Sequence, residues 1–321
     1  KGELLDYAVR YGRILMVSLP TFALQNMFQS FFVTAEKPQL GLAVTVSAGL
    51  TNMVLDAVLV ISLPQQYKLA GAALATALSQ VVGGTVPLFY FARKNSSMLR
   101  LGRTSFDGRA ILKACTNGSS EFMSNVSMNI VGMLYNTQLL KFAGENGVAA
   151  YGVMMYVSMI FSAAFIGYSI GTAPVVSYHD GARNFPELKS LLRKSLVVIG
   201  LFGVCMVASA ELLSSRLARM FVGYDAALME LTVSGFQIFA LSFIFMGFAI
   251  YGSSFFTALN DGLTSAAISF LRTLVFQVAA VLLLPTIWDI DGIWMSIVVA
   301  EFMAVVLAAA FLATKRRKYH Y

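Results

Sequence analysis

Long apolar stretches constrain the fold of this chain more than any other feature of its sequence. A helix that crosses a bilayer needs about 20 consecutive, mostly apolar residues. Nine stretches of the chain are long enough, with approximate bounds 11–33, 38–64, 69–92, 119–140, 147–176, 185–210, 231–259, 264–285 and 292–314. The sequence therefore predicts an all-α, polytopic membrane protein with nine transmembrane helices.

The composition supports this prediction and excludes several classes of protein. Hydrophobic residues make up 58% and charged residues 12% of the 321 residues, against about 45–50% and about 25% in soluble proteins. The net charge of +7 does not indicate nucleic-acid binding, because the basic residues lie at the ends of apolar stretches. The two histidines and two cysteines show no metal-ligand spacing, and no nucleophile–base pair or phosphate loop is present, so we do not expect an enzyme.

Basic residues between the apolar stretches predict the orientation in the membrane. They cluster in segments 93–113, 183–194 and 315–318, which lie on one side of the membrane if all the helices span it. Cytoplasmic loops carry the excess of Lys and Arg in membrane proteins. We therefore expect a multi-pass membrane protein with Lys1 outside and the C-terminus in the cytoplasm.

A weak internal repeat predicts the domain organisation. Residues 31–37 resemble residues 254–260 at an offset of 223, and many transporters are built from such repeats. We expect the full protein to have twelve helices in two six-helix halves, with three helices preceding Lys1. The expected parts of this chain are a partial N-lobe of three helices (1–93), a basic cytoplasmic inter-lobe loop (94–113), a six-helix C-lobe (114–314) and a basic cytoplasmic tail (315–321).

Two polar residues interrupt the second apolar stretch. Asn52 and Asp56 are four residues apart, so they lie on one face of a helix. A carboxylate at the centre of a transmembrane helix costs roughly 2.5–3.5 kcal/mol and usually marks an ion or proton path. Our central hypothesis is that Asp56, assisted by Asn52, binds the coupling cation of a transporter. The alternative is a buried hydrogen-bonded pair that only locks two helices together.

Two further polar residues extend this candidate cation site. Asn26 in the first predicted helix and Thr76 in the third supply an amide and a hydroxyl. Together with Asn52 and Asp56 they form a set of hard oxygen ligands that suits Na⁺, or a proton on Asp56. Each of them can also be an isolated interhelical hydrogen bond. No other metal and no cofactor is expected.

A second set of polar residues follows one face of the fourth predicted helix. Glu121, Asn125, Asn129 and Asn136 lie within about 120° of one another around a helix. Such a stripe lines either a helix contact or a water-filled cavity. We favour a cavity that holds the substrate, because one helix contact rarely needs several amides and a carboxylate.

Two further charges lie inside the predicted spans. Arg272 is in the eighth predicted helix and Glu301 is in the ninth, so charges of opposite sign occupy consecutive helices. We interpret them as a structural ion pair that neutralises itself, in preference to a direct role in transport.

Several short motifs together resemble one transporter family. They are Pro20 and residues 25–32, 35–38, 51–56, 118–122 and 271–273. With these motifs the chain resembles the bacterial MATE (multidrug and toxic compound extrusion) transporters, in particular their MepA-like branch, over essentially its whole length. The resemblance implies helices four to twelve of a twelve-helix, two-lobe fold that lacks its first three helices. It also implies a cation-coupled (Na⁺ or H⁺) antiporter of the bacterial inner (plasma) membrane that exports organic, often cationic, drugs or toxic compounds by alternating access.

The resemblance also assigns site residues. Four residues match the N-lobe cation site of the family: Asn26, Asn52, Asp56 and Thr76. A further Asp on the first family helix has no equivalent in this chain. Glu121 matches an acid on the seventh family helix, but the Asp of the tenth family helix is absent, and the corresponding stretch offers only Gln237 and Tyr251. Glu121 is therefore a candidate for substrate charge or proton exchange.

Two alternatives to a drug antiporter stay open. A lipid-linked saccharide flippase of the same superfamily would need a cationic cavity, whereas the internal charges here are mostly acidic, Arg272 excepted. A truncated, non-transporting remnant would have no upstream helices. The leading hypothesis predicts small organic cations or other drugs and the lipid bilayer as partners, no nucleic acid, and a monomer.

Overall fold

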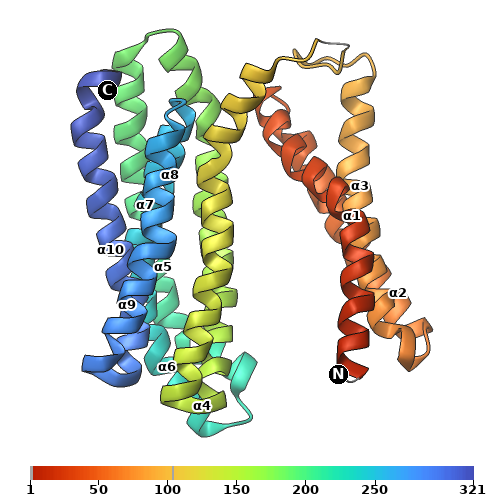
Figure 1. Cartoon of the computed structure of the whole chain (residues 1–321), viewed down its shortest axis with the longest axis vertical. Helices are drawn as coiled ribbons and strands as arrows, with labels where there is room; N and C mark the ends of the chain where they lie inside the picture. Colours follow the sequence, from red (N-terminus) through yellow and green to blue (C-terminus); the bar gives the residue numbers. More distant parts are fainter. Residues whose placement is uncertain (1–2, 103–104) are drawn as a thin grey trace. The chain divides into compact units, whose positions relative to one another are not determined.

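Helices make up nearly all of the described chain (Figure 1). The computed structural model describes residues 3–102 and 105–321, and neither range contains a β-strand. The predicted all-α fold is therefore confirmed. The chain divides into two compact units, unit 1 (Lys1–Phe106) and unit 2 (Asp107–Tyr321). Their boundary falls inside segment 94–113, which the sequence predicts as an inter-lobe loop.

Unit 1 is a bundle of three long helices. They are α1 (Glu3–Thr34), α2 (Pro38–Ser62) and α3 (Lys68–Ala92), with a 3₁₀ turn, η1 (Gln65–Tyr67), before α3. Pro38 begins α2, where its missing N–H removes no helical hydrogen bond. The third helix packs against both others. It approaches α1 most closely at Gly84, where an added Cβ would collide with the carbonyl oxygen of Thr21.

The second helix of unit 1 exposes most of its apolar side chains. Only Gly41 and Ala48 are buried along α2, whereas Met53 and Ile61 are 69% and 80% exposed. Its length and composition are those of a membrane span. Lipid is a favourable surrounding for such a surface, so the exposure agrees with the predicted transmembrane helix.

Unit 2 is built from helices that run alternately up and down in Figure 1. Their bounds are α4 (Gly108–Gly181), α5 (Phe185–Val222), α6 (Ala226–Ala240), α7 (Ser242–Ala258), α8 (Gly262–Phe270), the π-helix η2 (Leu271–Phe276), α9 (Gln277–Leu283) and α10 (Pro285–Tyr319). The element α4 holds two helices, because Gly144 interrupts it with the non-helical values φ 63° and ψ −154°; Figure 1 shows that the chain reverses direction within α4. Glycine reaches a positive φ without the steric cost of a Cβ.

Most of these helices are suited to cross a membrane. By length and composition, six helices of the described chain qualify, or seven if the bent pair α6 and α7 is one span. Adding α1 and the second half of α4 brings the described ranges to the nine helical passes that the sequence predicts. Two boundaries differ from the prediction. The stretch 231–259 is broken by a 45° bend between α6 and α7, and α5 continues to Val222, beyond residue 210.

The core of unit 2 is one apolar cluster with large aromatic rings at its centre. Trp294, Tyr251 and Phe243 are almost completely buried in it. Gly235 on α6 packs directly against Trp294 on α10, since an added Cβ would lie 2.8 Å from the indole ring. The dense core holds α4, α7 and α10 together and so positions the polar residues that project from them.

Candidate functional site

Unit 1 brings three of the four predicted cation ligands onto neighbouring faces of α2 and α3. The Asn52 side-chain amide donates a hydrogen bond of 3.4 Å to the Thr76 hydroxyl, which links the two helices. The Thr76 hydroxyl itself donates to the carbonyl oxygen of Ala72 one turn earlier. Asp56 lies one turn beyond Asn52 on the same face of α2.

The carboxylate of Asp56 has an unsatisfied oxygen. Its Oδ1 atom is buried and has no hydrogen-bond partner among the described residues. Buried polar atoms in folded proteins nearly always have a partner, so an exception calls for an explanation. A carboxylate oxygen in this position, one turn from the Asn52 amide that bonds the Thr76 hydroxyl, can accept a proton or coordinate a hard cation.

Asn26, the fourth predicted ligand, does not join this group through any side-chain hydrogen bond of the described residues. Its side chain is exposed on α1, and its amide donates to the carbonyl oxygen of Phe22 in the same helix, at 3.0 Å. The amide oxygen of Asn26 is the atom that a cation would need. Its part in the cation site therefore stays a prediction from the sequence.

The polar stripe of α4 lies on an exposed surface. Glu121, Asn125, Asn129 and Asn136 are all exposed. The amide of Asn125 donates to the carbonyl oxygen of Glu121 at 2.8 Å, and the amide of Asn129 donates to the carbonyl oxygen of Asn125 at 2.9 Å. These bonds stay within the helix and use the amide N–H groups. The amide oxygens and the carboxylate are left facing outward, where they can accept hydrogen bonds or attract a cation.

Arg272 and Glu301 form an ion pair inside unit 2. The Arg272 Nε atom lies 2.8 Å from Oε2 and 3.1 Å from Oε1 of Glu301. The carboxylate side chain is 3% exposed and the guanidinium side chain 15% exposed. Arg272 projects from the π-helix η2, and Glu301 from α10. Single-turn π-helices often occur at functional sites, although the pair is also explained by mutual neutralisation of two buried charges.

A buried hydroxyl network, which sequence reasoning missed, occupies the same core. The Tyr135 hydroxyl lies 2.9 Å from the Gln277 amide oxygen and 3.0 Å from the Ser296 hydroxyl. The ring of Tyr135 stacks on that of Tyr151, with centroids 5.2 Å apart. Gln277 was the available signal, because it is an amide inside an apolar stretch. Its partners belong to α4 and α10, which only the packing of the helices brings together.

A second unpredicted polar group joins the start of α8 to the end of α10. Oδ2 of Asp261 accepts hydrogen bonds of 2.8 Å from Lys315 and from the Tyr319 hydroxyl, and Oδ1 accepts one from the Thr264 N–H. Burial alone would raise the pKa of Asp261, but the hydrogen bonds from Lys315, Tyr319 and Thr264 outweigh it and lower the pKa to about 2. The carboxylate is therefore charged at neutral pH and holds the two helix ends together.

The two-unit helical fold and its intramembrane polar groups define a polytopic membrane transporter. A family model described as MatE matches residues 122–283, just over half of the chain. The chain belongs to this family, the MATE multidrug efflux transporters. The predicted resemblance to MATE transporters of the MepA-like branch is therefore confirmed.

Relatives and solved structures cover almost the whole chain. "Multidrug export protein MepA" of Staphylococcus haemolyticus (strain JCSC1435) is 25% identical over 321 residues, which are 99% of this chain and 69% of the relative. The protein of the same name from Staphylococcus aureus (strain MRSA252) is 22% identical over 312 residues. The matched region is 96% of this chain and 67% of the relative.

Two solved structures share the fold. The crystal structure of MATE in complex with MaL6 has a TM-score of 0.93 at 21% identity and covers 100% of this chain and 72% of its own. The outward-facing conformation of a multidrug resistance MATE family transporter of the MOP superfamily has a TM-score of 0.92 at 22% identity, with the same coverage. At this identity the likeness shows the fold alone.

Proposed function

We propose that the chain is part of a cation-coupled antiporter, driven by Na⁺ or H⁺, that exports organic and often cationic compounds by alternating access. The observation that carries the proposal is the buried, unpartnered Oδ1 of Asp56 beside the Asn52–Thr76 hydrogen bond. The names of the relatives, multidrug export proteins, support the export of drugs or toxic compounds.

The chemistry of this group favours a small hard cation or a proton. A lone carboxylate within a span costs roughly 2.5–3.5 kcal/mol, and protonation or a bound Na⁺ removes that cost by cancelling the charge. Carboxylate, amide and hydroxyl oxygens are ligands that such ions accept. Asn52 and Thr76 already connect α2 to α3, so an ion held between them would stabilise one arrangement of these helices. Coupling then requires that the two access states bind the ion unequally.

The stripe on α4 is the proposed substrate surface. Glu121 supplies the negative charge that an organic cation needs, and Asn125, Asn129 and Asn136 supply amide oxygens on the same exposed face. A flippase for a diphosphate-linked substrate is less favoured, because the cationic Arg272 is already neutralised by Glu301. No cofactor beyond the coupling ion, no nucleic acid and no catalysed reaction belongs to this proposal.

The proposed setting is the bacterial plasma membrane, with the C-terminus in the cytoplasm and a single copy as the transporting unit. The basic segments 93–113, 183–194 and 315–318 support this orientation through the excess of cations on the cytoplasmic side of membrane proteins. Cysteine labelling of the exposed C-terminal turn, with a reagent that does not cross membranes, tests it. Labelling in intact cells would contradict the orientation.

The Asp56→Asn variant tests the cation site. It is made in the full product of the gene that encodes this chain and expressed in bacteria without their own drug pumps. We expect cells with the unaltered protein to accumulate less of a fluorescent organic cation than cells with Asp56→Asn, at equal protein abundance in the membrane. Asp291→Asn is the matched control and should transport normally, since Asp291 is exposed and lies just after the non-helical residues Trp288 and Asp289 of α10. Equal transport by Asp56→Asn would refute the proposed cation site.

A further inference from the structure

The first turns of α5 carry cations without an ionic partner. Lys189, Arg193 and Lys194 are exposed, and none of them takes part in an ion pair with another residue of the described ranges. The one acid of the first turn, Glu187, is exposed and pairs with none of them. This end of α5 therefore presents uncompensated positive charge.

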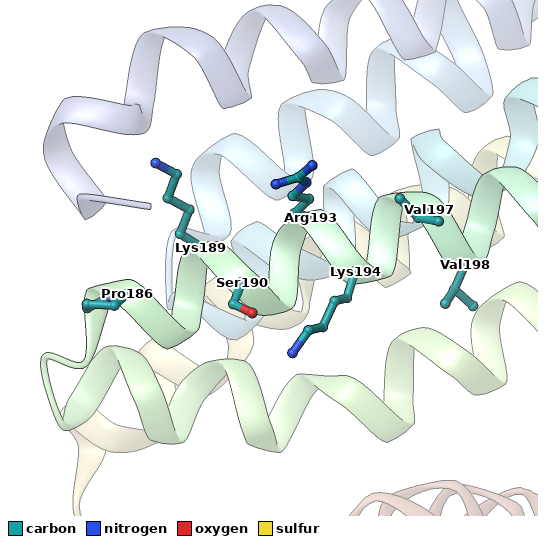
Figure 2. Close-up of a pocket in the computed structure, with 7 residues that line it drawn as sticks. All are labelled: Pro186, Lys189, Ser190, Arg193, Lys194, Val197 and Val198. Atoms are coloured by element: carbon teal, nitrogen blue, oxygen red, sulfur yellow. The ribbon is translucent and has the colours of Figure 1, made fainter.

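The three cations line a shallow hollow along the surface of α5 (Figure 2). Its volume is about 610 Å³, and Ser190 and Val197 also line it. Figure 2 shows Lys189 and Arg193 leaving one side of the helix and Lys194 leaving the other. An anionic group that lies along the hollow would therefore have cations on both sides. The Ser190 hydroxyl, which also lines the hollow, could donate a hydrogen bond to it.

Beyond the cations, the same face of α5 becomes apolar and remains exposed. Val197, Leu201 and Val204 are 56%, 63% and 59% exposed. They follow Arg193 at steps of three or four residues, so they form one row along the helix. From Arg193 to Val204 the helix rises about 16 Å, close to the ~15 Å of hydrocarbon in one bilayer leaflet.

The end of α10 adds positive charge near the start of α5. The ring of His320 lies 5.0 Å from the ring of Phe185, the first residue of α5. The last turn of α10 contains Arg316, Arg317 and Lys318. Lys318 lies 3.8 Å from Oδ2 of Asp261, so the field that adds to that of the hollow comes chiefly from Arg316 and Arg317 and favours an anion over a zwitterion.

We propose that Lys189, Arg193 and Lys194 bind the headgroup of an anionic phospholipid whose acyl chain lies along the exposed apolar row. The occupant is a lipid and not a soluble anion, because the cationic hollow continues into the apolar row, and the stretch from Arg193 to Val204 is about as long as the hydrocarbon of one leaflet. Clusters of Lys and Arg beside a membrane span attract anionic headgroups. The residues that line the hollow all belong to α5 and include neither Asp56 nor Glu121, so the site holds whether or not the proposed transport activity does.

Lipid binding to the purified, full-length protein in detergent tests this proposal. Native mass spectrometry measures binding of phosphatidylglycerol and of phosphatidylcholine with the same acyl chains. We expect tighter binding of phosphatidylglycerol to the unaltered protein. Each neutralised cation should weaken it about fivefold, so K189Q/R193Q/K194Q should lose on the order of 100-fold. L201Q should weaken binding of long-chain phosphatidylglycerol while retaining the preference over phosphatidylcholine.

Matched variants separate a defined site from a general effect of charge. R93Q/K94Q/K113Q removes the same number of exposed cations from segment 93–113 and should bind as the unaltered protein does. K189R/K194R keeps the charge and should also bind normally. The single variant K189Q is measured in case the triple variant does not fold.

Three results would overturn the proposal. Undiminished binding of phosphatidylglycerol by the triple variant, and by K189Q if the triple variant does not fold, would show that the hollow binds no lipid. An equal loss in R93Q/K94Q/K113Q would show that only net charge matters. Competition by inorganic phosphate at the same concentration as the lipid would show that the hollow takes a free anion.

Discussion

Removing one partner of the Arg272–Glu301 pair should destabilise unit 2 far more than removing both. Arg272→Met leaves the carboxylate of Glu301 without a cation, and this carboxylate is only 3% exposed. Breaking a buried ion pair in this way costs roughly 3–5 kcal/mol, whereas replacing both charges by apolar residues of similar volume is often neutral. We therefore expect the double variant Arg272→Met/Glu301→Met to be close to the unaltered protein in stability.

The exposed fractions also predict an order for the two single variants. Glu301→Met leaves Arg272 unpaired, but the guanidinium side chain is 15% exposed and its long stem lets the charge move toward water or lipid headgroups. Arg272→Met should therefore be the more damaging change, by about 1 kcal/mol, since its orphaned charge is the more deeply buried.

Thermal unfolding of the detergent-purified variants and their abundance in the membrane measure these differences. Arg272→Glu/Glu301→Arg adds a second comparison, because it keeps both charges and should regain the abundance that either single reversal loses. The reasoning is refuted if the double variants are no more stable than the single ones. In that case the 2.8 Å contact contributes nothing to the fold, and a direct role of these charges in transport becomes the better explanation.

Two further predictions concern helix contacts in each unit. Gly84→Leu should destabilise unit 1 by about 1–3 kcal/mol, because its Cβ collides with the carbonyl of Thr21; Gly49→Leu, where a Cβ meets nothing within 4 Å, should melt normally. Asp261→Asn should lower stability at pH 7 by roughly 1–3 kcal/mol, because it removes the ion pair with Lys315. The pKa of Asp261 is lowered to about 2 in the folded protein. Its carboxylate therefore contributes its full stabilisation above about pH 4, and this stabilisation is lost as the pH falls toward about 2. An Asp261→Asn variant that melts like the unaltered protein at about pH 7 would contradict this prediction.

The positions of the helices follow from local features of the sequence. Runs of about 20 apolar residues can satisfy their backbone in lipid only as helices or barrels, and Pro38 begins α2 as the sequence predicts. Spacing also placed Asn52 and Asp56 on one face of α2, because a period of 3.6 residues leaves no other arrangement. These features depend only on residues that are close together in the sequence.

Sequence reasoning also assigned the family, because its motifs are short segments whose residues are adjacent in the chain. The same means indicated only part of the hydrogen bonding among the four proposed cation ligands. Asn52 and Thr76 meet across two helices, but Asn26 donates to its own helix. Whether the Asn26 side chain faces Asn52 and Thr76 depends on how α1 is rotated about its own axis. The sequence pattern of α1 does not specify that rotation.

Apart from the Arg272–Glu301 pair, which opposite charges in consecutive helices indicated, the contacts between distant side chains became known only from the tertiary structure. Lys315 and Asp261 are 54 residues apart, and Tyr135 reaches Gln277 over 142 residues. Nothing in the apolar stretch 231–259 marks the 45° bend between α6 and α7. Each of these features depends on how closely the helices pack. Small residues such as Gly235 allow close packing, because they leave room for a ring of the opposite helix. The distance between two helices depends on both of their surfaces, so it cannot be read from either sequence segment alone.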